Sequence, residues 1–267
     1  MSGGVGEAGL LGLVQGLTEF LPVSSSGHLV LLQQFFEPSQ SSIAFDLALH
    51  VATLVPIVWL FREDVIRMAT APFKERGPLV DRPGTRMLLL IVVASIPTAA
   101  IGLLLEDVFE TLFSTPGTLL FSFATTGGIL WSTRGRANGP LDECSLTFKQ
   151  AFLLGAAQGA AITPGISRSG TTIATALLLG ADRGFAARFS FLLSIPAILG
   201  GFLLKVDELE MSAAAMTPLL VGMLVATVSG YIALKLLVGV VNRGNLSSFS
   251  WYCWVIALVA GAYAFLG

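Results

Sequence analysis

Hydrophobic residues along the chain gather into long segments that short polar stretches separate. Six of these segments are uninterrupted and approach the length of about 20 mostly apolar residues that a transmembrane helix needs. They lie at residues 43–61, 86–105, 117–133, 185–204, 216–238 and 250–266. The pattern predicts an all-α polytopic membrane protein, with these six segments as full transmembrane helices.

Two further apolar segments, at residues 8–36 and 148–180, are broken near their middles by proline, glycine and hydroxyl residues. The interrupting sequences are FLPVSSSGH in the first segment and TPGISRSGTT in the second. Such a break leaves backbone N–H and C=O groups unpaired, which a membrane tolerates only where protein or a wet cavity surrounds them. We therefore expect two re-entrant helix–loop–helix hairpins, which brings the fold to about ten helices.

The second broken segment repeats the first at a constant offset of 143 residues. The pairs include Leu11 with Leu154, Gly12 with Gly155, Gln15 with Gln158, Ser24 with Ser167, Ser26 with Ser169 and Gly27 with Gly170. A similar offset of 140 residues aligns the spans that follow, pairing Phe45 with Phe185 and Pro56 with Pro196. These matches predict an internal duplication, with one repeat over residues 1–140 and the other over residues 141–267.

The basic residues predict opposite orientations for the two repeats. Loops rich in Lys and Arg stay in the cytoplasm, and the loop between the first two full spans carries basic residues from Arg62 to Arg86. If that loop is cytoplasmic, thirteen of the fifteen basic residues are cytoplasmic, Lys205 is outside and Arg168 is unassigned. The first hairpin then enters from the outer face and the second from the cytoplasmic face. Inverted repeats of this kind place a site near the midplane, where their broken helices meet.

Composition narrows the classes of partner. Hydrophobic residues make up 54% of the 267 residues and charged residues only 12%, against about 25% charge in ordinary soluble domains. The 15 basic residues oppose 17 acidic ones without a basic run, so nucleic acid is not an expected partner. Cys144 and Cys253 are far apart in the sequence, which favours two free thiols over a disulfide. Membrane lipids are the surroundings that this composition suits.

Two ionisable residues lie deep in the broken segments, Glu19 in the first and Arg168 in the second. A charge at membrane depth costs about 2.5–3.5 kcal/mol, so it is usually paired or functional. One interpretation is an ion pair that only locks the two repeats together. That interpretation does not explain the hydroxyl residues around both charges, so we favour a functional site.

The hydroxyl and glycine residues stand where the second half-helix of each hairpin would begin. Free N–H groups and the helix dipole make such a terminus an anion site suited to phosphate. Together with the guanidinium fork of Arg168, two facing termini fit a diphosphate better than a single carboxylate. Plain capping of the two helices is the alternative. The candidate diphosphate-binding residues are Ser24, Ser26, Gly27, Ser167, Ser169, Gly170, Thr171 and Thr172.

Gln15 and Glu19 are four residues apart, so their side chains share one face of the first half-helix. A carboxylate beside a carboxamide, facing a phosphate, suits a hard cation with oxygen ligands such as Mg²⁺ or Ca²⁺. Gln15 and Glu19 are therefore the candidate metal ligands.

Two histidines follow these residues in the sequence. His28 lies near Ser25, where an imidazole can activate a hydroxyl or protonate a leaving oxygen, although a lone histidine is more often structural. His50 is four residues after Asp46 at the outer end of the next span. The pattern leaves open whether this second pair supports the site or only lies at the membrane interface.

The motifs QGLTEFLPVSSSGH at residues 15–28 and PGISRSG at residues 164–170 closely resemble those of the bacitracin-resistance type of undecaprenyl-diphosphate phosphatase. The resemblance extends over nearly all of the chain. It implies a metal-dependent enzyme, with Mg²⁺ or Ca²⁺, in the bacterial plasma membrane, whose site opens to the outer, periplasmic side. Its substrate would be a C55 isoprenoid diphosphate lipid, which loses its terminal phosphate. This reaction recycles the lipid carrier for peptidoglycan synthesis and gives bacitracin resistance.

The resemblance also implies roles for particular residues. Carried onto this sequence, the acidic motif of the family falls on Gln15 and Glu19, the site serine on Ser25, the histidine on His28, the arginine on Arg168 and the phosphate-contacting hydroxyls on Ser167 and Thr172. Gln15 is a departure, because many members have Glu there, and a mechanism that needs a carboxylate at that position would not apply. The sequence leaves a homodimer open.

Broken helices in inverted repeats are also the architecture of alternating-access transport. The alternative function is therefore a polyprenyl-phosphate lipid transporter or flippase without hydrolysis. The enzyme is favoured because hydrolysis needs a nucleophile, an acid or base and a charge clamp together. Glu19, Ser25, His28 and Arg168 supply these groups, and a transporter alone does not need them.

Overall fold

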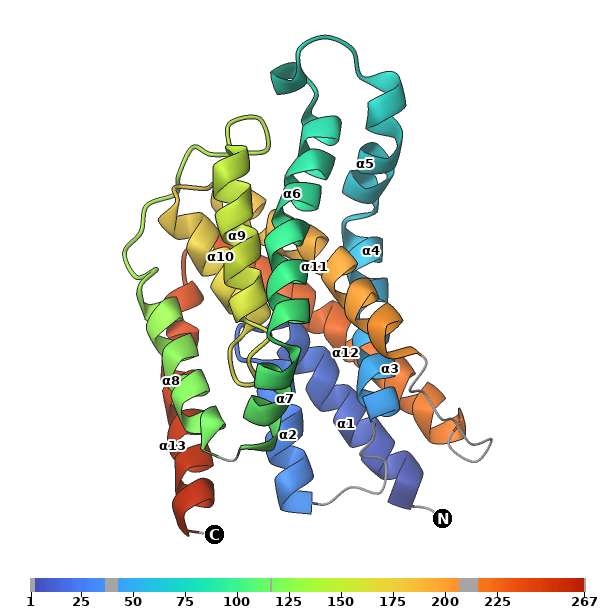
Figure 1. The fold of residues 1–267 in the computed structure, drawn as a ribbon, viewed down its shortest axis with the longest axis vertical. Helices are drawn as coiled ribbons and strands as arrows, with labels where there is room; N and C mark the ends of the chain where they lie inside the picture. Colours follow the sequence, from blue (N-terminus) through green and yellow to red (C-terminus); the bar gives the residue numbers. More distant parts are fainter. Residues whose placement is uncertain (1–2, 37–42, 116, 207–215, 267) are drawn as a thin grey trace.

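The computed structural model describes residues 3–36, 43–115, 117–206 and 216–266, and this part of the chain is built of helices joined by short connections (Figure 1). It contains no strand, only an isolated bridge between Leu141 and Ala181. The all-α prediction is confirmed. The helices are α1 (Gly3–Phe20), α2 (Ser25–Phe36), α3 (Ile43–Ala52), α4 (Leu54–Leu60), α5 (Arg62–Lys74), α6 (Pro83–Leu104), α7 (Glu106–Ser114), α8 (Thr118–Trp131), α9 (Phe148–Ala160), α10 (Arg168–Leu178), α11 (Arg183–Lys205), α12 (Met216–Asn242) and α13 (Phe249–Leu266).

Both broken segments fold as the helix–loop–helix hairpins that the sequence predicts. The first hairpin consists of α1 and α2, and the second consists of α9 and α10. In Figure 1 the first hairpin enters from the lower end of the molecule and the second from the upper end, and their loops meet near the middle. This opposed entry is the arrangement that inverted repeats produce.

The two loops approach each other closely because glycines lie at their points of contact. A Cβ atom on Gly27 would stand 2.8 Å from Cα of Gly165, and one on Gly170 would stand 3.1 Å from Cβ of Pro22. Gly27 is related to Gly170, and Pro22 to Gly165, by the same offset of 143 residues. The two contacts are therefore reciprocal, as a two-fold relation between the hairpins requires.

Gly27→Ala is expected to destabilise the protein by about 1–3 kcal/mol, because overpacking a filled space costs this much. The added methyl group would overlap the ring of Phe123, at 2.6 Å, and the backbone of Gly165. Thermal unfolding in detergent micelles measures the effect. Gly128→Ala is the matched control, since a Cβ atom there would have no neighbour within 4 Å. Equal melting temperatures for the two variants would contradict the close contact between the loops.

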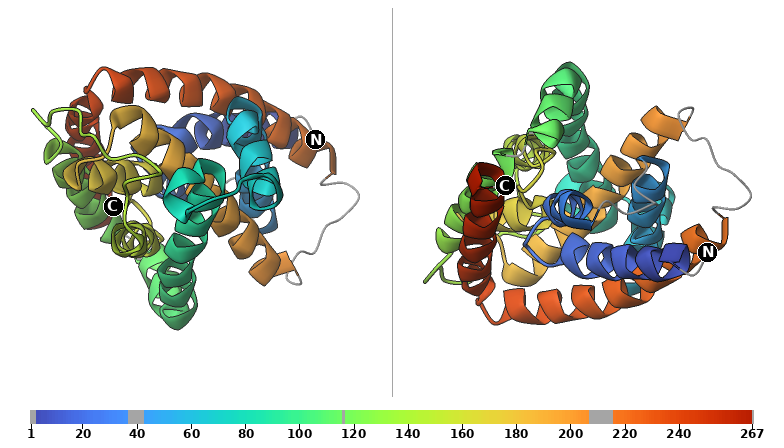
Figure 2. Two further views of the ribbon diagram at one scale, coloured as in Figure 1. Left: turned by 90° about the horizontal axis from the view of Figure 1, so that it is seen from above. Right: turned by 90° about the horizontal axis from the view of Figure 1, so that it is seen from below.

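The helices of the two predicted repeats pack across the boundary between them. α1 lies along α12, α9 lies along α6, and α8 packs against α13. Figure 2 shows α1 beside α12 in the view from below. The division into residues 1–140 and 141–267 stays a prediction, while the packing joins both parts into one interlocked body.

Four of the six predicted spans are single helices that are long and apolar enough to cross a membrane: Pro83–Leu104, Arg183–Lys205, Met216–Asn242 and Leu246–Ala264. Large apolar side chains are exposed on the outside of the bundle, among them Phe73, Leu104, Phe121, Leu203, Leu224 and Leu258. An exposed apolar surface of this extent needs lipid to cover it. The chain is a multi-pass membrane protein.

The other two predicted spans are not single full-length helices. Within residues 117–133 the helix is α8, Thr118–Trp131, whose 14 residues are fewer than the roughly 20 that a span needs. Residues 43–61 divide at Thr53, and the chain then bends by 79° into α5. Among the described residues, four helices are therefore long and apolar enough to cross a membrane, or five if the bent pair counts as one, where the sequence predicted six. These breaks also make the helices more numerous than the ten or so that we expected.

A proline accounts for the break in residues 43–61, and a hydrogen bond from a neighbouring helix explains why the break is tolerated. Pro56 has no N–H to donate to the carbonyl of Ala52, one helical turn earlier. Thr227 of α12 donates to that carbonyl instead, at 3.1 Å. The neighbouring helix thus satisfies a backbone group that lipid could not.

Candidate functional site

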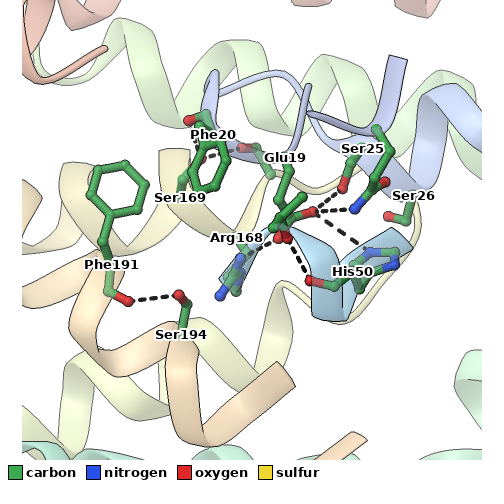
Figure 3. Close-up of polar contacts among 12 residues, drawn as sticks. Glu19, Phe20, Ser25, Ser26, His50, Arg168, Ser169, Phe191 and Ser194 are labelled. Carbon is green, nitrogen blue, oxygen red and sulfur yellow. Dashed lines mark hydrogen bonds and ion pairs between the residues drawn. The ribbon is translucent and has the colours of Figure 1, made fainter. Parts of the chain in front are cut away.

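The loops of the two hairpins bring Glu19 and Arg168 into direct contact (Figure 3). Glu19 lies in the last turn of α1, and Arg168 is the first residue of α10. Nη2 of Arg168 forms an ion pair with Oε1 of Glu19, and the side chains are only 18% and 4% exposed. The two charges that the sequence places in separate loops are therefore one buried pair.

The other carboxylate oxygen, Oε2 of Glu19, accepts two more hydrogen bonds. The hydroxyl of Ser25 donates from 2.5 Å and the amide of Gln15 donates from 3.0 Å. Three donors on one carboxylate offset much of the cost of burying its charge. The contact also places the hydroxyl proton of Ser25 where Glu19 can accept it, which is the relation of a nucleophile to a base.

The turn that leads to Ser25 has an unusual backbone. Ser24 has φ of +67°, and it is the one residue other than glycine with a positive φ in the described part of the chain. A positive φ costs a non-glycine residue about 1–3 kcal/mol, so the surroundings must hold it in place. The Ser24 hydroxyl accepts the N–H of Gly27 at 3.3 Å and lies 3.3 Å from the hydroxyl of Ser26. This turn ends the loop and begins α2 at Ser25.

In the second loop, two of the predicted phosphate-binding hydroxyls have structural partners. Ser167 caps α10 and accepts the N–H of Gly170 at 3.1 Å. Ser169 donates to the carbonyl of Phe20 at 3.0 Å and so ties the second loop to the end of α1. Both residues lie at the junction of the hairpins, and their contact with a phosphate stays a prediction.

The two threonines of the second loop differ from each other. Thr172 donates to the carbonyl of Arg168 at 2.8 Å and lies 2.5 Å from the hydroxyl of Ser190 on α11. The buried hydroxyl of Thr171 has no hydrogen-bond partner within the described residues. Ser190 is a neighbour of the site that the motifs did not indicate.

Two buried polar atoms beside the Glu19–Arg168 pair also lack partners among the residues described. Nη1 of Arg168 is a donor without an acceptor, and Oε1 of Gln15 is an acceptor without a donor. Buried polar groups are normally paired. A phosphate oxygen would satisfy the arginine, and a divalent cation would satisfy the glutamine oxygen.

The residues around Glu19 fit a cation that takes most of its ligands from elsewhere. In the described segments, no group of three or more His, Cys, Asp or Glu residues could hold a metal ion. Mg²⁺ commonly uses one or two carboxylates and completes its coordination with waters and substrate phosphates. Gln15 and Glu19 suit such a cation and do not form a complete site of their own.

His28 is bonded away from Glu19 and Ser25. Its Nδ1 lies 2.7 Å from the carbonyl oxygen of Ser24, and its Nε2 lies 2.7 Å from the hydroxyl of Tyr252 on α13. The sequence indicated no role for Tyr252, because 224 residues separate it from His28 and no motif surrounds it.

His50 is the imidazole that lies against Glu19, with 3.6 Å between Nε2 and Oε2. Its Nδ1 bonds to the carbonyl of Asp46 at 2.8 Å, and the Asp46 carboxylate accepts from Gln33 of α2 at 3.0 Å. Of the two interpretations of Asp46 and His50, these contacts favour support of the site. The 140-residue offset relates His50 to Ser190. This correspondence in the sequence could have indicated that α3 and α11 each place a polar residue beside the site.

Comparison with known proteins shows which family this chain resembles. Residues 8–259 match the family model for bacitracin resistance protein BacA. A protein named undecaprenyl-diphosphatase from Carboxydothermus hydrogenoformans is 42% identical over 257 residues, covering 94% of each chain. The protein of the same name from Desulfosudis oleivorans is 45% identical over 259 residues, covering 92% of this chain and 94% of the relative. That from Rubrobacter xylanophilus is 41% identical over 267 residues and covers 97% and 98%.

Proposed function

This chain belongs to the bacitracin resistance protein BacA family, and on that premise we propose that it hydrolyses undecaprenyl diphosphate to undecaprenyl phosphate and inorganic phosphate. Relatives that match it over nearly their full length are named undecaprenyl-diphosphatase. The observation that carries the proposal is the buried carboxylate of Glu19, which holds both Ser25 and Arg168. Phosphoryl transfer needs a nucleophile, a base and a positive charge in one place, and here these are the Ser25 hydroxyl, the Glu19 carboxylate and the Arg168 guanidinium. The product would return to peptidoglycan synthesis as lipid carrier, which accounts for bacitracin resistance.

In the proposed reaction, the Ser25 oxygen attacks the terminal phosphorus and its proton passes to Oε2 of Glu19. The bond from that phosphorus to the bridging oxygen breaks, and undecaprenyl phosphate leaves. Water then attacks the phosphorus of the phosphoserine and the bond from that phosphorus to the Ser25 oxygen breaks. The Ser25 oxygen recovers the proton from Glu19, and inorganic phosphate leaves as dihydrogen phosphate, which keeps both protons of the water. Arg168 would bind phosphate oxygens through Nη1, which no described residue occupies. Electrostatic stabilisation of this kind supplies most of the catalysis in phosphoryl transfer.

The same contacts allow a second arrangement, in which Ser25 only binds the phosphate and Glu19 directs a water at the phosphorus. Acid quenching during turnover of substrate with a radiolabelled terminal phosphate distinguishes the two. Phosphoserine at Ser25 would support attack by the serine. A fully active enzyme without it would assign the attack to water.

We propose that the other hydroxyl and glycine residues of both loops line the diphosphate site. They are Ser24, Ser26, Gly27, Ser167, Ser169, Gly170, Thr171 and Thr172. The unpaired hydroxyl of Thr171 supports this assignment, because a buried donor normally has a partner. Gln15 and Glu19 would hold Mg²⁺ or Ca²⁺, which supplies positive charge to phosphate oxygens when it is bound. Since Gln15 replaces a second carboxylate, the charge of the cation site depends on Glu19.

Phosphate release by the purified protein in detergent micelles tests the proposal. We expect release from undecaprenyl diphosphate at a rate that rises with protein concentration. The opposed hairpins also favour a lipid transporter or flippase. Micelles have no two compartments, so a protein of that kind without hydrolysis would bind the lipid and release no phosphate. That outcome would overturn the enzyme and favour the transporter.

We propose that the protein lies in the bacterial plasma membrane with the upper end of Figure 1 in the cytoplasm and its site open to the outer side. Basic residues from Arg62 to Arg86 gather at this end, and such residues stay inside. Cys144 lies between α8 and α9, and Cys253 is buried.

A membrane-impermeant thiol reagent is therefore expected to label Cys144 in inside-out membrane vesicles and not in intact cells. Cys144→Ser is the control, because it leaves only the buried Cys253. Labelling of Cys144 in intact cells would reverse the proposed orientation.

A further inference from the structure

We infer that Tyr252 is a positioning residue of this site. It acts through His28 on the turn at Ser24, which directs the hydroxyl of Ser25. The inference rests on the proposed function, because its effect is measured in diphosphate hydrolysis. It assigns α13, the last helix of the chain, a part in a site built from the first hairpin.

The hydrogen bonds of His28 define which ring nitrogen carries the proton. Nδ1 faces the carbonyl oxygen of Ser24 at 2.7 Å, and a carbonyl can only accept, so Nδ1 is the donor. In the neutral ring Nε2 is then an acceptor, and the hydroxyl of Tyr252 donates to it from 2.7 Å. Tyr252 therefore stabilises the tautomer that can donate to Ser24.

The rings around His28 hold its orientation as well. It stacks on Tyr252 with 5.7 Å between ring centroids and 11° between ring planes. The ring of Phe123 on α8 meets it edge to face at 5.3 Å and 86°. Tyr252 is 43% exposed on the outside of the bundle. A partly buried tyrosine hydroxyl usually has a hydrogen-bond partner, and His28 supplies one.

The turn at Ser24 needs this support because of its backbone. Its φ of +67° is a conformation that a serine rarely adopts without help. The Ser24 carbonyl accepts both the backbone N–H of His28, at 3.3 Å, and its ring Nδ1. If the ring contact is lost, the turn can relax, and the Ser25 hydroxyl then moves from its place 2.5 Å from Glu19.

The second hairpin provides an internal comparison. At the 143-residue offset, Ser167 corresponds to Ser24 and Thr171 corresponds to His28. Ser167 has an ordinary φ of −73°, and its carbonyl accepts the backbone N–H of Thr171 at 2.9 Å. The strained turn and the histidine thus occur together, in the loop that carries the candidate nucleophile. The unstrained turn at Ser167 has a threonine, Thr171, in place of the histidine.

The test is Tyr252→Phe, which removes the hydroxyl and keeps the ring. We expect kcat for phosphate release to fall about tenfold, because small misplacements of a reacting group have large effects on rate. KM should stay within about twofold, since Arg168 still binds the phosphate. Tyr231→Phe is the matched control, because the ring of Tyr231 lies against Lys235, one helical turn later on α12.

Two further variants separate positioning from general damage. In a His28→Ala background, Tyr252→Phe should have no further effect, because Tyr252 acts only through His28. His28→Asn, whose side-chain N–H can still donate to Ser24, should retain more activity than His28→Ala. Nitrogen NMR of the His28 ring should show protonated Nδ1 in the wild type and a mixture of tautomers in Tyr252→Phe.

A wild-type kcat in Tyr252→Phe, or the same loss in the His28→Ala background as in the wild type, would overturn the inference about Tyr252. A wild-type protein that releases no phosphate would overturn the proposed function instead. Melting temperatures of all variants in micelles show whether a lost activity follows a lost fold.

Discussion

Arg168→Ala is expected to reduce phosphate release from undecaprenyl diphosphate at least about a thousandfold, which corresponds to roughly 4 kcal/mol of transition-state stabilisation. The arginine is the cation at the junction of both hairpins, and its Nη1 has no partner within the described chain. Arg168→Lys keeps the charge and loses the planar fork, so we expect it to recover only part of the rate. Steady-state phosphate release in micelles measures both variants.

Removal of one partner from a buried ion pair also destabilises a protein, by about 3–5 kcal/mol. The melting temperature of Arg168→Ala must therefore be measured with its rate. Arg243→Ala is the control, because Arg243 is an exposed arginine just after α12. Near-normal activity in a folded Arg168→Ala protein would remove the arginine from the mechanism.

Glu19→Gln is expected to lower kcat about a hundredfold to a thousandfold, because the amide keeps the size of the side chain and loses the base. In the wild type we expect EDTA to abolish activity and Mg²⁺ or Ca²⁺ to restore it. The residual activity of Glu19→Gln should respond little to either treatment, since the variant lacks the carboxylate of the proposed cation site. Phosphate release with and without EDTA gives both results in one series.

Glu106→Gln is the control for this substitution, because Glu106 is 46% exposed and pairs with Lys205 on the surface. Its rate and its response to EDTA should equal those of the wild type. Full activity of Glu19→Gln in the presence of EDTA would contradict both the base and the cation assigned to Glu19.

The sequence was sufficient to predict the two hairpins and the place where they meet. A break in an apolar segment must be surrounded by protein or by a water-filled cavity, because backbone groups cannot stay unpaired in lipid. The two breaks carry Glu19 and Arg168, and the 143-residue offset relates their surroundings. Chain connectivity and the cost of buried charge were therefore enough to indicate one site between the two loops.

The contacts of the histidines could not be predicted in the same way. His28 was expected beside Ser25, and its ring bonds to Tyr252 on α13 instead. His50 was the weaker candidate, and it lies against Glu19. Each contact depends on how helices distant in the sequence pack, and neither leaves a local pattern in the residues around it.

The break within the predicted span at residues 43–61 could not be predicted for a similar reason. Hydropathy reports whether a segment is apolar, and it does not report whether a neighbouring helix replaces a missing hydrogen bond. The break at Thr53 depends on Pro56, which lacks a donor, and on Thr227, which supplies one from α12. Only the packed structure contains that second piece of information.

The packing of α1 along α12 has a consequence for the order in which the protein can be assembled. The ribosome makes α1 first and reaches α12, at Met216–Asn242, only after most of the chain has been made. Until then the first hairpin lacks the helix that covers it, along with Tyr252 of α13. The amino-terminal half of the site therefore gains these contacts only after the carboxyl-terminal helices have been made.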